Sequence, residues 1–216
     1  MQMAQNIRRY KGARAIPELK GLSKMKVDGS FDDWIKISVE YRDTKGDVFH
    51  RDHKGYGGLH YTNNSGRNDI VTCKVAVDKK NIFFYAETNQ PLTPSSGNNW
   101  MLLLIDADQN SATGWHGYDF LINKKIKDDK TTTLMRYDAN AAGDHWKEVA
   151  QLGYRYNGNA LELYVPRSIL GLKGDGFTFD YHWADNPEDL ETPISLSIKG
   201  DSAPNRRFNY RSIWKK

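Results

Sequence analysis

Alternating apolar and polar residues predict that most of the chain after residue 70 forms β-strands. In residues 70–78, Val71, Cys73, Val75 and Val77 fall on one face of an extended chain, and polar residues fall on the other. The apolar stretch 82–87 follows after a short polar turn, so the two segments are predicted to pair as a hairpin.

The same pattern continues toward the C-terminus. Residues 100–105 form a continuous apolar run, which is typical of a strand buried on both sides. Asn157-Gly158 predicts a tight turn between strands 154–156 and 161–165, and Gly171 is predicted to end a short helix that starts at Pro166. Further strands are predicted at 118–123, 131–138, 146–152, 177–183 and 194–198.

Nine or ten short strands with long loops and little helix indicate an all-β protein, and an antiparallel β-sandwich is the architecture we expect. Residues 43–68 show no periodicity and are predicted to form a long loop. Residues 1–25 read as a basic lead-in or linker, and residues 26–216 as one sandwich domain. The lead-in resembles a helix tail entered midway, so we expect a domain excised from a longer exported protein, extracellular or periplasmic, although no signal peptide is present.

Composition narrows the functional classes. The chain has 216 residues and a net charge of +4, with both signs interspersed, which argues against a nucleic-acid-binding surface. The longest apolar run has six residues, too short for a membrane-spanning helix. The single cysteine, Cys73, excludes a disulfide framework and a cysteine-based zinc site.

A candidate metal loop follows the apolar strand 100–105. Asp106, Asp108 and Asn110 occupy alternate positions ahead of Gly114, which resembles a calcium loop because a hard cation takes several oxygens from a tightly turning backbone. The match to an EF-hand is incomplete, since no glycine follows Asn110 and no glutamate closes the loop. The alternative is an Asx-rich loop whose side chains hydrogen-bond to their own backbone.

Aromatic residues make up 12% of the chain, and several fall at predicted strand ends or in loops beside polar residues. A flat ring that stacks on the apolar face of a pyranose, with polar neighbours for the hydroxyls, is the usual basis of sugar binding. The candidates for ligand binding are Trp115, Trp146, Trp183, Tyr118 and Trp100. The competing interpretation places these rings in the core, as we expect for Trp34 and Trp214.

Catalytic signatures are lacking in the sequence. It contains no GxSxG, HExxH, P-loop or GxGxxG motif, and no spacing singles out a carboxylate pair. His50 and His53 lie three apart in the predicted loop and are expected at the surface. A binding role is therefore favoured over catalysis.

Four segments together resemble a known type of domain. They are VDGSFDDW (27–34), GRNDIVTCKVAVDKKNIFFYAET (66–88), WMLLLIDADQNSATGWHGYDFLIN (100–123) and LELYVPRSILGL (161–172). Their order and spacing are similar to those of the family 9 carbohydrate-binding modules and their DOMON-like jelly-roll relatives. With the basic lead-in, the chain also resembles the C-terminal region of exported bacterial proteins whose catalytic part is similar to the family 71/99 glycoside hydrolases.

The resemblance implies a non-catalytic accessory module of a polysaccharide-degrading protein, which grips a glycan between aromatic rings and carries structural calcium. On that reading Trp115 and Trp146 are the first candidates for ring platforms, and Asp106, Asp108 and Asn110 are the metal loop. One alternative is a structural brace against a catalytic domain, which an exposed apolar patch without polar neighbours would favour. A second alternative is a hydrolase that acts on glycosidic bonds. A grooved aromatic surface ringed by polar residues would favour sugar binding.

Overall fold

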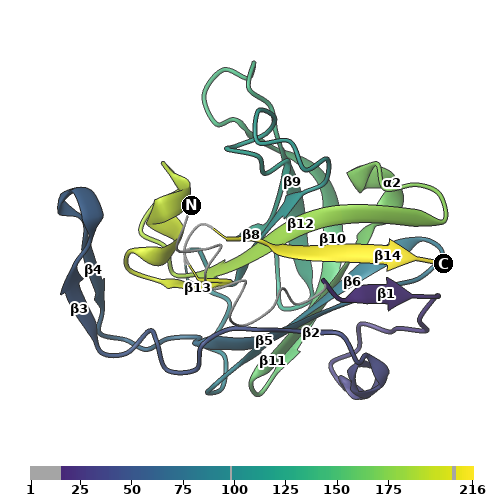
Figure 1. The fold of residues 1–216 in the computed structure, drawn as a ribbon, viewed down its shortest axis with the longest axis horizontal. Helices are drawn as coiled ribbons and strands as arrows, with labels where there is room; N and C mark the ends of the chain where they lie inside the picture. The colour runs from purple at the N-terminus through teal and green to yellow at the C-terminus, as the bar shows by residue number, and fades with distance from the viewer. Residues whose placement is uncertain (1–15, 98, 206–207) are drawn as a thin grey trace, which may run out of the picture.

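The computed structural model describes residues 16–97, 99–205 and 208–216 and is almost entirely β (Figure 1). Its strands are β1 (Glu18–Lys20), β2 (Glu40–Arg42), β3 (Arg51–Lys54), β4 (His60–Asn63), β5 (Ile70–Val77), β6 (Asn81–Thr88), β7 (Leu102–Asp106), β8 (Phe120–Ile126), β9 (Thr131–Tyr137), β10 (Trp146–Asn157), β11 (Ala160–Pro166), β12 (Gly176–Asp185), β13 (Asp201–Ala203) and β14 (Tyr210–Lys215). Short helices are η1 (Asp32–Lys36), η2 (Tyr56–Gly58), α2 (Arg167–Leu170) and η3 (Pro193–Ser197).

One 12-stranded sheet folds over on itself to make the sandwich. Its strand order is β1-β14-β12-β7-β8-β9-β10-β11-β6-β5-β2, with β13 beside β12, and neighbours are antiparallel except β1 and β14. The fold-over lies at β10, whose first part pairs with β9 from Trp146 to Gly153 and whose last part pairs with β11 from Tyr154 to Asn157. We call the layer from β1 to β10 the larger sheet and the layer from β10 to β2 the smaller sheet. The predicted all-β, sandwich-like fold is confirmed.

The main core fills the space between the two layers. Phe84 of the smaller sheet meets Phe179 and Tyr181 of the larger sheet, with ring centroids 5.9 and 5.7 Å apart. The alternation predicted for 177–183 explains this contact, because the aromatic side of β12 faces the core and His182 faces away. Burial of these rings is the main source of stability that the fold offers.

Two further apolar clusters lie outside the sandwich. Leu102, Leu104 and Leu121 project from the outer face of the larger sheet and are covered by loops and η3. On the outer face of the smaller sheet, Trp34 and its neighbours from the segment before β2 cover Ala76 and Phe83. Both sheets are therefore buried on two sides over part of their area, as predicted for residues 100–105.

Local sequence accounts for most of the strand pairing. The hairpin β5–β6 forms as predicted, but a register shift between Ile70 and Thr72 turns Val71 out of the core. Asn157-Gly158 makes the turn between β10 and β11, and Gly171 ends α2 in a left-handed conformation with φ 74°.

Three segments differ from the sequence-based expectation. The predicted loop 43–68 contains the antiparallel hairpin β3–β4, which extends away from the sandwich (Figure 1). The predicted strand 194–198 is replaced by the helix η3 over Pro193–Ser197, because Pro193 sets a helical start and Leu196 packs on the outer face of the larger sheet. Residues 18–20, at the end of the predicted lead-in, pair with β14; residues 1–15 lie outside the described residues. Within the described part of the chain, no helix combines the length and apolarity needed to cross a membrane.

Candidate functional site

Three of the predicted sugar-binding residues lie together on the outer face of the larger sheet. The ring centroids of Trp115 and Tyr118 are 6.1 Å apart, and those of Trp115 and Trp146 are 6.4 Å apart. Trp115 is 7% exposed, Tyr118 is 4% exposed and Trp146 is 6% exposed. The sequence therefore identified residues that meet in space, but the loops around them cover the ring faces that a sugar would need.

The other two candidates belong to the main core. Trp100 and Trp183 are fully buried between the sheets. The Trp100 indole N–H donates to the carbonyl of Thr93 at 2.9 Å. The expectation that these rings stand at the surface is not met, because both lie on core-facing sides of the sandwich. All six tryptophans are buried, including Trp34 and Trp214, which were expected to pack.

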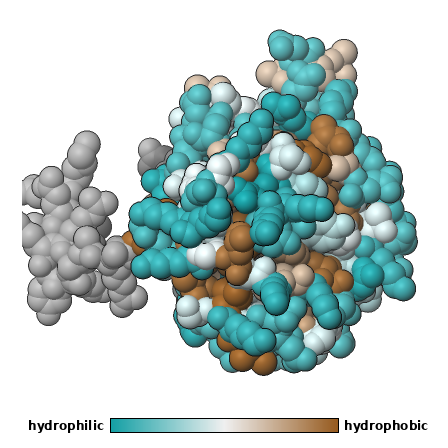
Figure 2. Space-filling view, turned by 90° about the vertical axis from the view of Figure 1, so that its right-hand side faces the viewer, coloured by the Kyte–Doolittle hydropathy of each residue, from teal (hydrophilic) through white to brown (hydrophobic). Residues whose placement is uncertain are grey.

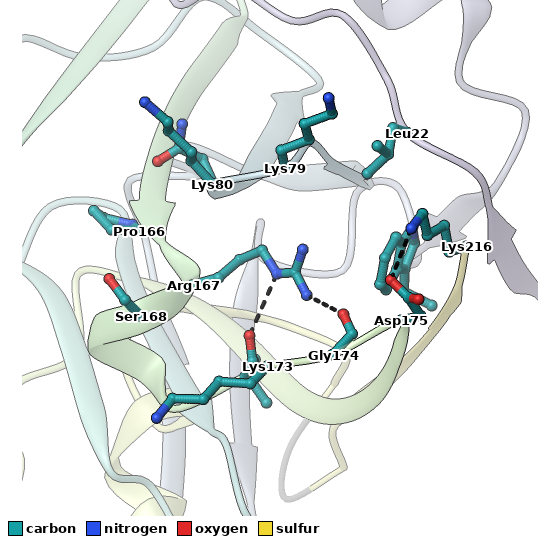
Figure 3. A pocket seen from close by; sticks show the side chains of 13 residues that line it. Leu22, Lys79, Lys80, Pro166, Arg167, Ser168, Lys173, Gly174, Asp175 and Lys216 are labelled. Carbon is teal, nitrogen blue, oxygen red and sulfur yellow. Dashed lines mark hydrogen bonds and ion pairs between the residues drawn. The ribbon is translucent and has the colours of Figure 1, made fainter.

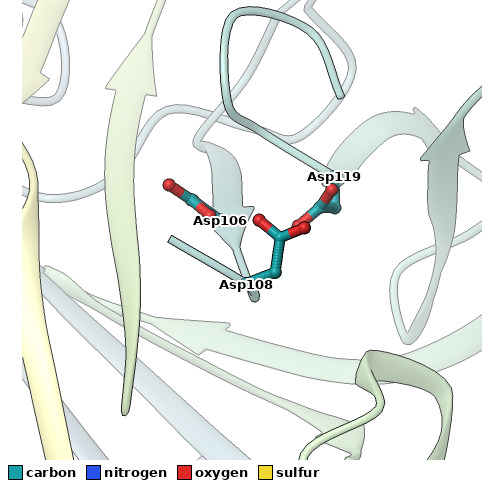
Figure 4. Close-up of side chains that lie close together, drawn as sticks. All are labelled: Asp106, Asp108 and Asp119. Carbon is teal, nitrogen blue, oxygen red and sulfur yellow. The ribbon is translucent and has the colours of Figure 1, made fainter. Parts of the chain in front are cut away.

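Asp106, Asp108 and Asp119 form a cluster where β7 ends and β8 begins, and we call them the loop carboxylates (Figure 4). One oxygen from each lies within 4.8 Å of the others, which is a spacing that suits three ligands of one cation. Asp119 was missed by the sequence analysis. Its position follows from the antiparallel pairing of β7 and β8, which brings the residue before β8 next to the residue that ends β7.

The predicted metal ligands also bond to their own loop. Asp106 Oδ1 accepts from the Gln109 amide at 2.6 Å, and Asp108 Oδ1 accepts from the Asn110 amide at 2.9 Å. Asn110 is exposed, and its Oδ1 accepts from the Ala112 amide at 3.1 Å. These bonds are the ones that an Asx-rich loop makes. The calcium site stays a prediction.

Electrostatics tune this cluster. Burial, with smaller contributions from the carboxylates of Asp119, Asp180 and Asp108, raises the pKa of Asp106 to about 6. Arg211 lies nearby and forms a bidentate pair with Asp180, with both contacts at 2.8 Å. The loop carboxylates are thus partly balanced by a protein cation.

A groove that the sequence analysis did not identify lies beside Trp34, and we call it the aromatic groove. It has a volume of about 480 Å³ and lies between η1 and the outer face of β2, β5 and β6. Its rings are Phe31, Trp34 and Tyr85; the Tyr85 centroid lies 5.9 Å from that of Phe31 and 5.2 Å from that of Trp34. The other lining residues are Ser30, Asp32, Ile35, Glu40, Arg42, Thr72, Lys74 and Glu87.

Strand register sets the polar side of the aromatic groove. Glu40 stands opposite Lys74, which stands opposite Tyr85, so one row crosses β2, β5 and β6. Lys74 donates to the carbonyls of Trp34 and Ile37, both at 3.1 Å, and pairs with Glu40 at 3.2 Å. The lysine thereby holds η1 against the sheet.

Glu162 of β11 fixes the segment that carries the rings. One carboxylate oxygen accepts from the Asp28 and Gly29 amides at 2.9 and 2.8 Å, and the other accepts from the Trp34 indole at 2.8 Å. Glu162 is 1% exposed, and burial raises its pKa. Two of the segments that suggested the family resemblance, 27–34 and 161–172, are thus joined by one buried carboxylate.

A second hollow of about 730 Å³ lies at the end of the molecule where the C-terminus lies (Figure 3). Arg167 lies at its centre, with its guanidinium 4.8 Å from the ring centroids of both Phe177 and Trp214. It donates to the carbonyls of Leu172, Asp78 and Gly174 at 3.3, 3.4 and 2.7 Å. The bonds to Leu172 and Gly174 close the turn after α2, and the bond to Asp78 joins it to the turn between β5 and β6, so Arg167 is a structural side chain.

Lysines give this hollow a positive charge. Lys79, Lys80 and Lys173 line it and make no ion pair with any described residue, while Lys216 pairs with Asp175 at 3.1 Å. Figure 2, which looks at this end of the molecule, shows exposed apolar residues set among hydrophilic ones. The charge favours anionic over cationic ligands.

One histidine is placed where the sequence gave no reason to expect it. His53 is exposed, as expected for the segment around it, whereas His182 is fully buried on the outer side of β12. Its Nδ1 bonds to the Phe208 carbonyl at 2.9 Å, and its Nε2 has no partner among the described residues. Burial lowers the pKa of His182 to about 4.

No family model matches the chain, and no curated protein or solved structure does so either. The resemblance to the family 9 carbohydrate-binding modules stays a prediction.

Proposed function

We propose that this chain is a non-catalytic module that binds a neutral glycan, and that the aromatic groove is its binding site. The single observation that carries the proposal is the combination, in one groove, of the partly exposed Phe31 ring with rows of polar side chains; the buried Tyr85 ring packs against Phe31 and supports it. A partly exposed ring provides stacking surface for a pyranose, and the polar groups serve its hydroxyls.

The charge balance of the aromatic groove favours an uncharged ligand. Glu40 forms ion pairs with both Lys74 and Arg42, so the cations are not free to attract an anion. Glu87 offers a carboxylate at the other end of the groove, next to Thr72 across β5 and β6. Glu40 and Glu87 offer acceptors, and Arg42 and Thr72 offer donors, to the hydroxyls of a neutral sugar.

The state of Glu40 supports binding over hydrolysis. Burial raises its pKa, but hydrogen bonds from Lys74 and Arg42 outweigh burial and lower the pKa overall. A glycosidase needs one carboxyl that stays protonated to serve as the acid. Glu40 is ionised at neutral pH and can accept hydrogen bonds from hydroxyls.

The wider setting belongs to the same proposal. The module would serve a polysaccharide-degrading protein that is exported, and a catalytic domain in that protein would be its partner. Its affinity would be weak, on the order of micromolar to millimolar, because a shallow groove buries few ligand atoms.

A glycan array with the full chain, followed by calorimetric titration of the best ligand, tests the proposal. Phe31→Ala is expected to weaken binding at least about tenfold, because it removes the exposed ring. Phe49→Ala is the matched control, since Phe49 is 63% exposed and does not line the aromatic groove. Its affinity is expected to equal that of the parent.

Two outcomes would count against the proposal. Equal affinities of the parent and Phe31→Ala would remove the aromatic groove from consideration. Loss of binding in Trp115→Phe or Trp146→Phe, with an unchanged melting temperature, would move the site to the outer face of the larger sheet. If no glycan bound at all, the exposed Ile35 and Phe49 would favour a structural brace.

A further inference from the structure

Four aspartates from distant parts of the chain meet at one edge of the sandwich, and we call them the inner carboxylates. They are Asp43 after β2, Asp47 before β3, Asp69 before β5, and Asp201 at the start of β13. Hydrogen bonds hold them in one neighbourhood. The side-chain amide of Asn205 donates through Nδ2 to Asp43 at 2.8 Å and to Asp47 at 2.6 Å.

The other two are tied to the same group through the backbone. Asp69 Oδ2 accepts from the amide of Gly46, next to Asp47, at 2.9 Å. Asp201 Oδ2 accepts from the amide of Ile70, next to Asp69, at 2.7 Å. Each inner carboxylate is therefore held by hydrogen bonds to only one of its two oxygens.

The second oxygen of each inner carboxylate is buried and has no hydrogen-bond partner among the described residues. Asp201 and Asp69 are only 1% and 3% exposed, so water does not replace the missing partners at the surface. A buried polar atom without a partner costs about 1–3 kcal/mol, and more when it carries charge. Four such oxygens in one place call for a positively charged ligand.

Described cations lie near the inner carboxylates without pairing with them: Lys45 partly offsets the raised pKa of Asp69, and Arg51 donates to the carbonyl of Gly200, next to Asp201. No described lysine or arginine forms an ion pair with any inner carboxylate. Burial, with a smaller contribution from the Asp47 carboxylate, raises the pKa of Asp43 to about 6. Burial also raises the pKa of Asp201, and Asp47 and Asp43 add to that shift.

A neighbouring hydroxyl shows the same lack of a partner. The hydroxyl of Tyr210 is buried without a hydrogen bond, and after burial and Cys73 the carboxylates of Asp43, Asp201 and Asp47 raise its pKa. It lies within the electrostatic reach of the inner carboxylates. The region thus collects oxygen atoms, and none of the described lysines and arginines forms an ion pair with them.

From this arrangement we propose that Asp43, Asp47, Asp69 and Asp201 bind a calcium ion. An all-oxygen set with several carboxylates suits calcium, which accepts six to eight oxygens in variable geometry. No three inner carboxylates bring ligand atoms within 4.8 Å of one another, so side-chain rotation must close the site around the ion. Magnesium demands a near-ideal octahedron and suits such a site less well.

The test uses the full chain stripped with a chelator and then titrated with calcium or magnesium by calorimetry, with melting temperature followed in parallel. We expect one calcium to bind with a Kd below about 10 µM, and saturation to raise the melting temperature by at least about 5 °C. Magnesium is expected to bind at least about tenfold more weakly. Absence of calcium binding by the stripped chain would overturn the proposal.

A second test uses the direction in which Asp201→Asn changes the melting temperature of the stripped protein. The asparagine keeps an acceptor for the Ile70 amide and removes one negative charge, so the stripped variant should melt at a higher temperature than the stripped parent. Calcium affinity should fall at least about 100-fold, and the stabilisation by calcium should be lost. Asp108→Asn, in the loop carboxylates, is the matched control and should keep the high-affinity binding.

The remaining outcomes also decide the matter. Unchanged calcium binding in Asp201→Asn, or loss of binding in Asp108→Asn alone, would place the ion elsewhere and refute the proposal. A stripped Asp201→Asn variant that melts below the stripped parent would show that the charge of Asp201 does not destabilise the metal-free protein. That result would also contradict the proposal.

Discussion

The loop carboxylates and the inner carboxylates are both groups of aspartates, yet they differ in what they lack. The loop carboxylates bring three ligand atoms within 4.8 Å, but each of them already accepts a hydrogen bond from its own loop, and Asp108 is exposed to water. The inner carboxylates are less tightly gathered, but each has a buried oxygen without a partner. Ligand atoms that lie close together indicate that a cation could fit between them. Buried carboxylate oxygens without hydrogen-bond partners indicate that a cation would stabilise them.

Glu162 gives this comparison a third member. It is as buried as Asp201, but its two oxygens accept three N–H bonds, from Asp28, Gly29 and Trp34. A buried carboxylate is therefore stable in this protein without a cation when enough donors surround it. The inner carboxylates have fewer donors for each charge.

The largest expected effect comes from distorting the loop that holds the loop carboxylates. Gly114 has φ 61°, and a Cβ there would lie 2.2 Å from the Tyr118 carbonyl oxygen. Gly114→Ala should therefore lower the free energy of unfolding by about 4 kcal/mol, as measured by urea denaturation.

Gly143→Ala is the matched control for this variant. Gly143 also has a positive φ, 77°, but a Cβ there meets nothing within 4 Å, so the expected cost is about 1 kcal/mol. Equal losses in the two variants would show that the contact with Tyr118 is not what shapes the loop.

Acid should destabilise the folded protein through His182, which lies on the side of the larger sheet that bears the loop carboxylates. Its pKa of about 4 in the folded state lies below the ordinary value of 6.5, so as pH falls the unfolded chain takes up the proton first. The free energy of unfolding should decrease by about 3 kcal/mol between pH 6.5 and 4 because of this group.

His182→Gln isolates the contribution of the histidine. Asp43 and Asp106, whose pKa values are raised to about 6, act in the opposite direction, since the folded state binds their protons more readily. The measurement is therefore the difference between the pH–stability curves of the parent and the variant. Parallel curves over this range would contradict the prediction.

Glu162→Gln should cost about 2 kcal/mol, because the amide group of glutamine faces the Trp34 N–H as a second donor. The loss should be the same with calcium and with chelator, in contrast to Asp201→Asn. Adding Trp34→Phe, which removes the indole donor, should cost less in the Glu162→Gln background than in the parent. Additive losses would show that the two side chains do not act together.

The smallest effect is expected for Asp108→Asn. The side chain is exposed, so the free energy of unfolding should change by less than about 0.5 kcal/mol. If the loop carboxylates bind calcium as predicted, the variant should lose a second, weaker step in a calcium titration and keep the first. A titration of the parent with one step only would remove the predicted calcium loop.

The sequence predicted the fold where local patterns decide it. Alternation identified β5 and the core-facing side of β12, an apolar stretch after a polar turn identified β6, and Asn157-Gly158 fixed the hairpin β10–β11. The hairpin β3–β4 was missed because its strands read RDHK and HYTN, which contain no aliphatic residue and show no alternation. A strand with few packing contacts needs no regular pattern of apolar residues, so the sequence does not reveal it.

Sites were harder to predict, because they depend on which segments meet. Asp106 and Asp108 were found from their spacing, but Asp119 needs the pairing of β7 with β8. Trp115 and Trp146, both predicted as ring platforms, lie side by side, yet only the course of the loops reveals that their faces are covered. The inner carboxylates come from opposite ends of the chain and follow no local motif.

The twelve-residue strand β10 is bonded to β9 along its first part and to β11 along its last part, so both layers of the sandwich share one continuous piece of backbone. The layers cannot slide apart as independent leaves; any opening must first peel this strand from one of its neighbours. Amide protons in β10 should consequently be among the slowest in the molecule to exchange with solvent, and the sandwich should unravel as a single cooperative unit.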